Sequence, residues 1–398
     1  MALTKLRTYG PAAKVPMKIA CGVPGAKRFI HVGVHNSANR NSGDTLLFPV
    51  VRRAFDALIG PIDWELQQAW SEFDIELAER LNDDVDGIVI GGGGLLLRDQ
   101  AGSDVTNSGW QWNSSISALQ ALKVPIIAFA IGYNRFRGQA DFDPIFTKHI
   151  RMLVEKSGFF GLRNSGSIRA LGKYLTPSLN EKIRRQYCPT TLIWQLYPEY
   201  REMAEAHAKK NQRVFAFNAA FDRAEMRFGA DQKRMLDKLA QAVHAAANRG
   251  WKIVVTAHKT MDREIEPYLD MVGVNYETVD LTDANPDEIM EFYSKVDFAF
   301  GMRGHAQMIP FGLRRPIMSI ISHDKMRFLL EDIDRLEWGV EIDSPDLKNN
   351  LVSALARVES EKESVDASIA NAQSQVWEET LTNFSLIDKV TSAANKPE

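Results

Sequence analysis

Arg303 and His305 are the side chains best suited to chemistry, because they stand two positions apart directly after an apolar run that ends at Gly301. That run has the pattern of a buried parallel strand, residues 304–311 that of a short helix, and residues 316–321 that of the next strand. Free N–H groups at a helix start attract negative charge. Arg303 adds a bidentate cation suited to phosphate or carboxylate, and His305 adds a group that exchanges a proton near neutral pH. The pattern predicts chemistry on an anion.

More cations are expected at the same edge of this sheet, because ligands of doubly wound folds bind at the carboxyl ends of the strands. Lys325 follows the strand at 316–321, and the N–H groups near Gly304 start the helix. Arg223 follows the strand expected at 214–217. The competing interpretation is structural, with Arg303 and His305 as a packed pair and Lys325 in an exposed basic patch.

A polar turn in the first half, Asn41-Ser-Gly-Asp44, comes between a predicted strand at 28–34 and a predicted helix that ends near Gly60. Asp44 could simply cap that helix. Alternatively, Asn41 or Asp44 binds acceptor hydroxyls or takes a proton from one, because a carboxylate at the carboxyl end of a strand faces the ligand. Both interpretations stay open.

A second turn is predicted at Gly91 to Gly94, after the apolar strand at 85–90. It does not fit a dinucleotide-binding Gly-x-Gly-x-x-Gly loop, because leucines occupy positions 96 and 97. Either the glycines are needed for packing, or Gly92 and Gly93 present backbone to a ligand with Arg98 beside them.

Strand-like and helix-like segments alternate through both halves of the chain, which indicates two parallel sheets flanked by helices. We therefore predict an α/β protein with two doubly wound, Rossmann-like domains. The first spans residues 1–200 and the second residues 201–398, including a C-terminal helix.

The composition is that of a globular protein with room for two cores: 398 residues, 45% hydrophobic and 25% charged. A net charge of -3 argues against nucleic-acid binding, and no apolar stretch approaches the length of a transmembrane helix. Two distant cysteines and the absence of an apolar leader predict a cytoplasmic protein. His31 and His35 lack companions at metal-ligand spacing, so we predict no metal.

Several of these motifs together resemble the polysaccharide pyruvyl transferase family. The resemblance covers roughly residues 30 to 335 and includes the Arg-x-His helix followed by Arg-Pro and a strand, the segment from Ser322 to Phe328, the two N-terminal turns, and an Arg-x-x-x-Ser element at 163–167. Departures are Gly304 for leucine, His323 for tyrosine and Cys188 for aspartate. The family's arginine after the strand at 214–217 is displaced, and Arg223 is the proposed replacement.

The resemblance implies transfer of a pyruvyl group from phosphoenolpyruvate to two hydroxyls of a sugar, giving a cyclic ketal in the biosynthesis of a surface polysaccharide or exopolysaccharide. It also implies a glycosyltransferase-B-like fold with a cleft between the domains, and no cofactor beyond the co-substrate. In this interpretation His305 and Asp44 are catalytic. The expected binding residues are, for the donor, Arg303, Gly304, Arg223 and Lys325, and for the acceptor, Asn41, Gly43, Gly92, Gly93 and Arg98.

Two other functions remain in view. A nucleotide-sugar glycosyltransferase would use Arg303 for the diphosphate and Glu331 or Asp332 for the ribose. A non-catalytic sugar-binding protein is the second alternative. The expected partners are a small-molecule donor and a sugar or polysaccharide-precursor acceptor, and the sequence allows a homo-oligomer.

Overall fold

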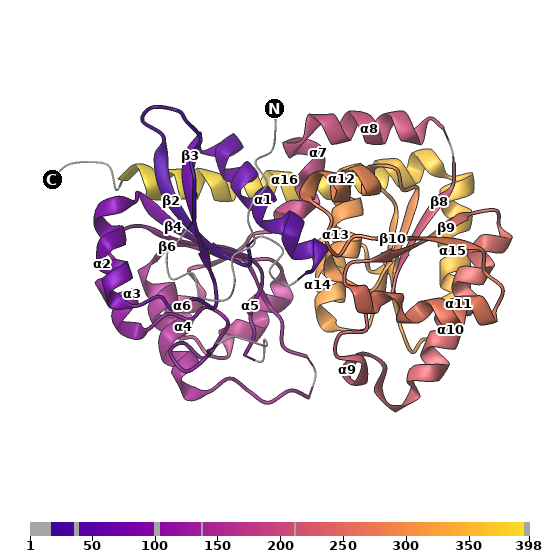
Figure 1. Ribbon diagram of the computed structural model, residues 1–398, viewed down its shortest axis with the longest axis horizontal. Helices are drawn as coiled ribbons and strands as arrows, with labels where there is room; N and C mark the ends of the chain where they lie inside the picture. Colours follow the sequence, from indigo (N-terminus) through magenta and orange to yellow (C-terminus); the bar gives the residue numbers. More distant parts are fainter. Residues whose placement is uncertain (1–16, 36–39, 99–103, 137, 211, 394–398) are drawn as a thin grey trace. The chain divides into compact units, whose positions relative to one another are not determined.

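The computed structural model describes residues 17–35, 40–98, 104–136, 138–210 and 212–393, which form two compact units (Figure 1). The first unit contains the described parts of 1–39, 51–187 and 379–398, and the second contains 40–50 and 188–378. No helix in these ranges has both the length and the apolar character needed to cross a lipid bilayer.

The first unit is built on a seven-stranded sheet in the order β1-β3-β2-β4-β5-β6-β7, parallel except for the pairing of β1 with β3. Helix α3 packs against both α2 and α4 beside this sheet (Figure 1). The elements are β1 Met17–Ile19, β2 Lys27–Gly33, α1 Ser42–Leu58, β3 Ile62–Gln68, α2 Ile75–Asp84, β4 Gly87–Leu96, α3 Ile116–Ala121, β5 Ile126–Tyr133, α4 Pro144–Lys156, β6 Ser157–Leu162, α5 Ser165–Gly172, α6 Pro177–Asn180 and β7 Ile183–Arg185.

The second unit has six parallel strands in the order β10-β9-β8-β11-β12-β13. Counted from β8, this is the 3-2-1-4-5-6 order of a Rossmann fold. The strands are β8 Val214–Asn218, β9 Lys252–Ala257, β10 Tyr276–Asp280, β11 Phe298–Gly301, β12 Ile317–Ile321 and β13 Gly339–Glu341. The helices are α7 Ile193–Leu196, α8 Pro198–Ala208, α9 Ala224–Phe228, α10 Gln232–Asn248, α11 Glu266–Met271, α12 Pro286–Ser294, α13 Gly304–Gly312, α14 Asp324–Asp332, α15 Leu347–Ser360 and α16 Lys362–Ala393, with 3-10 turns η1 Pro189–Leu192, η2 Gly229–Asp231, η3 Thr260–Ile265 and η4 Leu336–Trp338.

The core of the second unit lies between its sheet and the apolar faces of α10 and α15, which contact each other. Leu236, Leu239 and Val243 of α10 repeat at three and four residues and are completely buried. This packing holds the strands in place, so that the loops at their carboxyl ends are carried by a rigid support.

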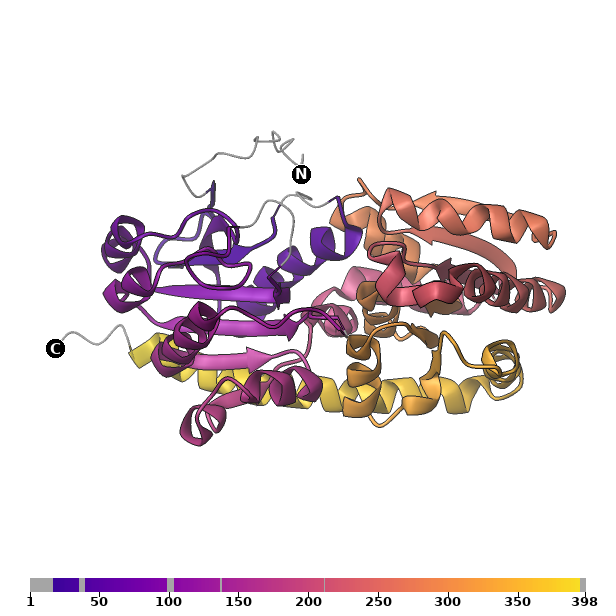
Figure 2. The same cartoon turned by 90° about the horizontal axis from the view of Figure 1, so that it is seen from below.

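The division of the chain differs from the predicted single boundary at residues 200 and 201. Figure 2 shows α16 as one unbroken helix, yet its residues from 379 onward belong to the first unit. There Phe384 packs against Phe55 and Phe129, with ring centroids 5.0 and 5.4 Å away. Residues 40–50 belong to the second unit, where the backbone N–H of Ser42 donates to the carbonyl of His258 at 3.1 Å. These two assignments depend on contacts between residues far apart in the chain, which the order of strands and helices along the sequence does not reveal.

The predicted turn at Gly91 to Gly94 is wrong, because these glycines lie inside β4. The strand continues to Leu96, and its pairing with β5 is irregular between Gly93 and Leu96. Gly91 has a φ of 112°, and a Cβ atom there would lie 2.9 Å from Cγ1 of Ile131. Glycine is therefore needed for the close approach of β5.

Sequence analysis also missed β3. Its side chains alternate between apolar and polar types, but Glu65 and Gln67 are buried like their apolar neighbours. Glu65 is neutralised by Arg80 of α2 at 2.9 Å. The buried polar residues interrupt the apolar run expected of a central strand, and the alternation of Ile62, Trp64 and Leu66 was the signal that could have indicated it.

Candidate functional site

Charged side chains gather at the carboxyl edge of the sheet in the second unit. Strands β8 and β11 are neighbours at this edge, although β9 and β10 lie on the far side of β8. The strand order reverses at this point, and doubly wound folds bind ligands at such a reversal. Asn218 ends β8 and Arg303 follows β11, and the Arg303 backbone N–H donates to Oδ1 of Asn218 at 3.2 Å.

Arg303 is buried, with 8% of its surface exposed, and two aspartates hold its guanidinium. Asp262 of η3 accepts from Nε at 2.7 Å and from Nη2 at 2.5 Å, and Asp222 lies 2.7 Å from Nη1. Burial disfavours the charged guanidinium, but the two carboxylates outweigh this effect and raise the pKa of Arg303. Two nitrogens of the predicted bidentate cation are therefore already bound to Asp262. A buried cation requires counter-charges, and the chain itself supplies them.

Asp262 fixes this arrangement, although it was not among the predicted site residues. Its Oδ2 atom also accepts from Nδ2 of Asn218 at 3.1 Å and from the backbone N–H groups of His258 and Lys259 at 3.0 and 3.2 Å. The side chain is completely buried. It therefore ties the loop after β9 to Asn218 and to Arg303.

Arg227 is a second arginine of the site that sequence analysis missed. Its side chain is 1% exposed, and its Nη2 atom lies 3.1 Å from Asp222 Oδ2. Nε donates to the carbonyl of Asp222 at 2.8 Å, and Nη1 donates to Oγ of Ser322 at 3.1 Å. Arg227 stands in α9, after β8, the region from which a displaced arginine was expected.

The predicted candidate in that region, Arg223, stands at the start of the same helix. It is the N-cap residue of α9, with a left-handed φ of 58°, and it is half-buried. A carboxylate within five residues of each strand end, Asp222 after β8 and Asp262 after β9, was the sequence signal that could have indicated a paired Arg303.

Asp222 carries the charge that both arginines share. Burial disfavours its ionised form, but Arg303, Arg227 and Lys325 outweigh this effect and hold its pKa well below the usual range. The predicted site residue Lys325, in the first turn of α14, therefore does lie close enough to act on this cluster. Among the described residues, no three His, Cys, Asp or Glu side chains are grouped as metal ligands.

His305, half-buried in the first turn of α13, lies between the predicted polar turn and a cysteine. Its Nε2 atom is 3.7 Å from Sγ of Cys188. A Cβ atom on Gly43 would lie 2.8 Å from Cγ and 2.9 Å from Cβ of His305, so any larger residue there would push the imidazole out of its position. The structure thus brings Gly43 and His305 together, two predicted site residues more than 250 positions apart.

Asn41 and Asp44 flank this contact at the start of α1. Nδ2 of Asn41 donates to Oδ2 of Asp44 at 2.8 Å, and Oδ1 of Asn41 accepts from the Gly43 N–H at 3.3 Å. Asn41, rather than Asp44, therefore caps the helix. Both residues are half-buried beside Gly43.

Gly304 starts α13, whose first turn has no side-chain cap. The nearest atom to a Cβ atom built on Gly304 is Cε of Met308 at 3.8 Å, so this glycine is not required for space. Its N–H group stays at a helix N-terminus, as predicted from the sequence.

His258 is a buried neighbour of this cluster. Its Nε2 atom lies 2.6 Å from the hydroxyl of Tyr293. Burial, followed by the charges of Arg303 and His305, lowers its pKa well below the ordinary value. Its imidazole is therefore neutral and supplies no cation to the site.

In the first unit, the predicted acceptor residues have structural partners. Gly92 and Gly93 are buried within β4. Arg98 lies 3.4 Å from Asp143, the N-cap residue of α4, and donates to the carbonyl of Asp141. Trp110 and Trp112 are completely buried and serve packing.

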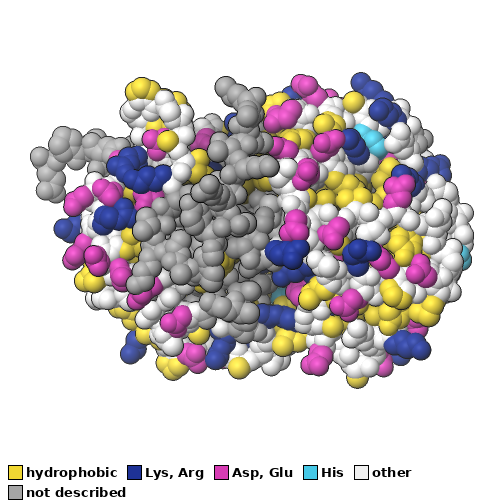
Figure 3. Space-filling model, viewed as in Figure 1, with side chains coloured by type: hydrophobic (Ala, Val, Ile, Leu, Met, Phe, Trp, Pro, Cys, Tyr) yellow, Lys and Arg dark blue, Asp and Glu magenta, His cyan; other side chains and the backbone are white. Residues whose placement is uncertain are grey.

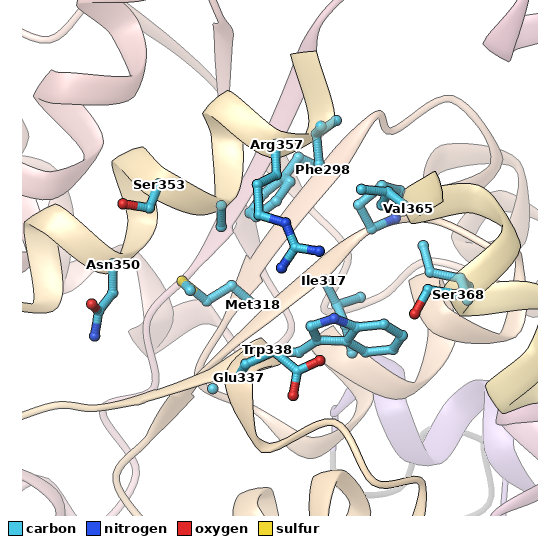
Figure 4. A pocket seen from close by; sticks show the side chains of 15 residues that line it. Phe298, Ile317, Met318, Glu337, Trp338, Asn350, Ser353, Arg357, Val365 and Ser368 are labelled. Atoms are coloured by element: carbon cyan, nitrogen blue, oxygen red, sulfur yellow. The ribbon is translucent and has the colours of Figure 1, made fainter. Parts of the chain in front are cut away.

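The described surface and a separate cavity can be compared with the site. On the face drawn in Figure 3, acidic and basic side chains of the described residues are interspersed. A cavity of about 370 Å³ is also separate from the site (Figure 4). It is lined by Phe298 and Ile317, the first residues of β11 and β12, and therefore lies at the amino edge of the sheet, opposite Arg303.

A family model for polysaccharide pyruvyl transferases matches residues 27–324, which include every element of this edge up to the start of α14. The chain belongs to this family. None of the curated proteins matches the sequence.

Solved structures resemble this family member in fold at low identity. Anabaena HepE in complex with UDP and glucose is 9% identical, covers 92% of this chain and 100% of its own, and has a TM-score of 0.53. UDP-GlcNAc 2-epimerase from Methanocaldococcus jannaschii is 11% identical, covers 82% of this chain and 92% of its own, and has a TM-score of 0.50. The predicted class of two Rossmann-like domains, of glycosyltransferase-B type, is confirmed.

Proposed function

We propose that this family member transfers the pyruvyl group of phosphoenolpyruvate to two hydroxyls of a sugar and forms a cyclic ketal. The observation that carries the proposal is the meeting of Arg303, Arg227 and His305 at the strand-order reversal of the second unit. Phosphoenolpyruvate carries a phosphate and a carboxylate, so its binding needs several cations and N–H donors. Lys325, Arg223 and the N–H of Gly304 complete the proposed donor site.

The reaction needs two proton transfers. Carbon 3 of the enol takes up one proton, two acceptor hydroxyls lose one each, and the second proton leaves with the phosphate when the bond between carbon 2 and its oxygen breaks. Two new bonds from carbon 2 to oxygen form the ketal. We assign one transfer to His305 and the other to Asp44, because Gly43 between Asn41 and Asp44 contacts the imidazole.

We also propose which residues bind the acceptor sugar, from their position beside His305. Asn41 and Gly43 lie beside His305 and are suited to bind a sugar hydroxyl. Gly92, Gly93 and Arg98 are further proposed acceptor residues from the sequence pattern. A role in surface polysaccharide or exopolysaccharide biosynthesis, the cytoplasmic location and a homo-oligomer also stay predictions.

The glycosyltransferase alternative has weaker support from the residues. Glu331 and Asp332 close α14, whereas Lys325 lies in its first turn. A helix rises 1.5 Å per residue, so these carboxylates lie about 10 Å along the axis from the site. The UDP in the HepE complex is a ligand of that protein, and at 9% identity the likeness shows the fold only.

The test is phosphate release from phosphoenolpyruvate by the purified protein, with and without a panel of sugars. Sugar-dependent release supports pyruvyl transfer. Binding of a uridine or guanosine diphosphate sugar without such release supports the glycosyltransferase. If the protein shows neither phosphate release nor nucleotide-sugar binding, the result supports a non-catalytic sugar-binding protein. Arg303→Lys should raise the KM for phosphoenolpyruvate, because a point charge cannot replace the fork held by Asp262 and Asp222.

A further inference from the structure

Asp222 is the most exposed member of the buried charge cluster. Its side chain is 28% exposed, against 9% for Arg303, 1% for Arg227 and 0% for Asp262. A solute that approaches the two guanidinium groups therefore meets the Asp222 carboxylate first.

The hydrogen bonds divide the two guanidinium groups into permanent and exchangeable parts. Asp262 holds Nε and Nη2 of Arg303, which leaves only Nη1 to Asp222, at 2.7 Å. On Arg227, Ser322 and the carbonyl of Asp222 hold Nη1 and Nε, and only Nη2 contacts the Asp222 carboxylate. An anion that took the place of this carboxylate could bond the same two nitrogens, Nη1 of Arg303 and Nη2 of Arg227.

The charges favour such an exchange. Arg303, Arg227 and Lys325 all act on Asp222, and with Asp262 on Arg303 the cluster holds three cations against two carboxylates, which leaves one positive charge in excess. A phosphoryl dianion is a stronger electrostatic partner for three cations than a monoanion is. The backbone need not move, because Nε of Arg227 holds the carbonyl of Asp222 at 2.8 Å while the side chain rotates.

We propose that the Asp222 carboxylate is an internal occupant of an anion site, which a phosphoryl group enters by displacing it from Arg303 and Arg227. The inference rests on the proposed function only for the identity of the ligand, the phosphoryl group of phosphoenolpyruvate. Asp222 is then a specificity-determining residue. A singly charged anion that displaces it only exchanges one negative charge for another, whereas a phosphoryl dianion adds a second charge and binds more tightly.

The test compares two neutral substitutions of different length. Asp222→Ser and Asp222→Asn remove the same charge, but the asparagine amide still reaches the arginines, whereas serine is too short. Displacement predicts that calorimetric affinity for inorganic phosphate rises about tenfold in the serine variant and less in the asparagine variant. Asp222→Ala replaces the serine variant if circular dichroism shows that the serine variant is unfolded.

The matched control is Asp366→Asn, which removes one negative charge from an exposed pair with Lys362 on α16. It should leave phosphate affinity unchanged. Equal gains in the two Asp222 variants would mean that charge alone acts and would overturn displacement. Unchanged or weakened phosphate binding in both variants would overturn it as well.

Phosphoenolpyruvate and UDP titrations in the same variants separate this inference from the proposed function. If the wild-type protein releases phosphate from phosphoenolpyruvate but Asp222→Ser gains no affinity, the function stands and displacement fails. If Asp222→Ser gains affinity for inorganic phosphate and UDP while no variant uses phosphoenolpyruvate, displacement stands and the proposed donor fails.

Discussion

The two units reverse their strand order at comparable places, but they place different chemistry there. In the second unit, β8 and β11 meet at a buried network of two arginines and two aspartates. In the first unit, β2 and β4 meet at glycines and neutral histidines. The topology supplies a place for a ligand in each unit, and the side chains decide whether that place carries charge.

The histidines of the first unit have acceptor nitrogens that face an arginine. Nε2 of His31 donates to the carbonyl of Gly91, and Nε2 of His35 donates to the carbonyl of His31 at 2.8 Å. Both Nδ1 atoms face Nη1 of Arg52, at 3.4 and 3.5 Å. Neutral imidazoles thus face Arg52 here, where ionised carboxylates hold Arg303, so these histidines bring no negative charge to this edge that an incoming anion could replace.

The largest effect is expected from removing His305, which tests whether the second unit carries the catalytic residue. We expect His305→Ala to lower kcat by about two to four powers of ten, because a positioned general acid or base contributes that much. The measurement is sugar-dependent phosphate release. The fold should persist, since His305 is half-buried in the first turn of α13 and its removal leaves the buried ion pairs of Arg303 in place.

Lowering the pH should destabilise the first unit more than the second. Burial, followed by Arg52, lowers the pKa of His35 to about 3, and burial lowers the pKa of His149 to about 3. Burial, followed by His35 and Arg52, lowers the pKa of His31 well below its ordinary value. Because the unfolded chain binds these protons first, stability is lost as the pH falls from about 6.5 toward 3, by about 2 kcal/mol per histidine at pH 5.

Among the described residues, the first unit has three such histidines and the second has one, His258. Region-resolved hydrogen exchange at pH values of about 7.5 and 5, corrected for the intrinsic rate, should show the larger loss in the first unit. His35→Asn should reduce that loss by about 2 kcal/mol. Equal losses in the two units would contradict the assignment.

A smaller loss of kcat is expected when the imidazole of His305 is only displaced by a substitution at Gly43. An alanine Cβ at 43 would press on the imidazole, so we expect Gly43→Ala to lower kcat about 10- to 100-fold. Ser353→Ala is the control, because Ser353 of α15 lines the cavity at the opposite edge of the sheet. Similar kcat values for both variants would argue against a positioned imidazole.

The smallest effect is expected at the first unit's edge. Arg98 is one-third exposed and pairs with Asp143, so Arg98→Ala should change the free energy of unfolding by less than about 1 kcal/mol. If Arg98 binds the acceptor, the same variant raises the acceptor KM. Asp143→Asn weakens the same pair without removing the arginine, and it should leave that KM unchanged. Equal acceptor KM values in both variants would remove Arg98 from the acceptor site.

Local patterns predicted the elements around Arg303 well. The apolar run before Gly301, the helix from Gly304 and the strand ending at Ile321 are all confirmed, because each has a clear period or boundary signal. Strand β3 escaped prediction because buried Glu65 and Gln67 break its apolar pattern. The glycines of β4 were predicted as a turn because a local pattern does not show that β5 approaches closely.

By itself, the sequence determined the two α/β halves, the family and the Arg303–His305 turn, since hydrophobic period and residue spacing are local properties of the chain. Only the tertiary structure decided that Asp222 and Asp262 neutralise Arg303, that Arg227 joins them, and that Gly43 supports His305. These partners are brought together by the strand order. Electrostatic pairing of a buried cation depends on distances in space, which spacing along the chain does not specify.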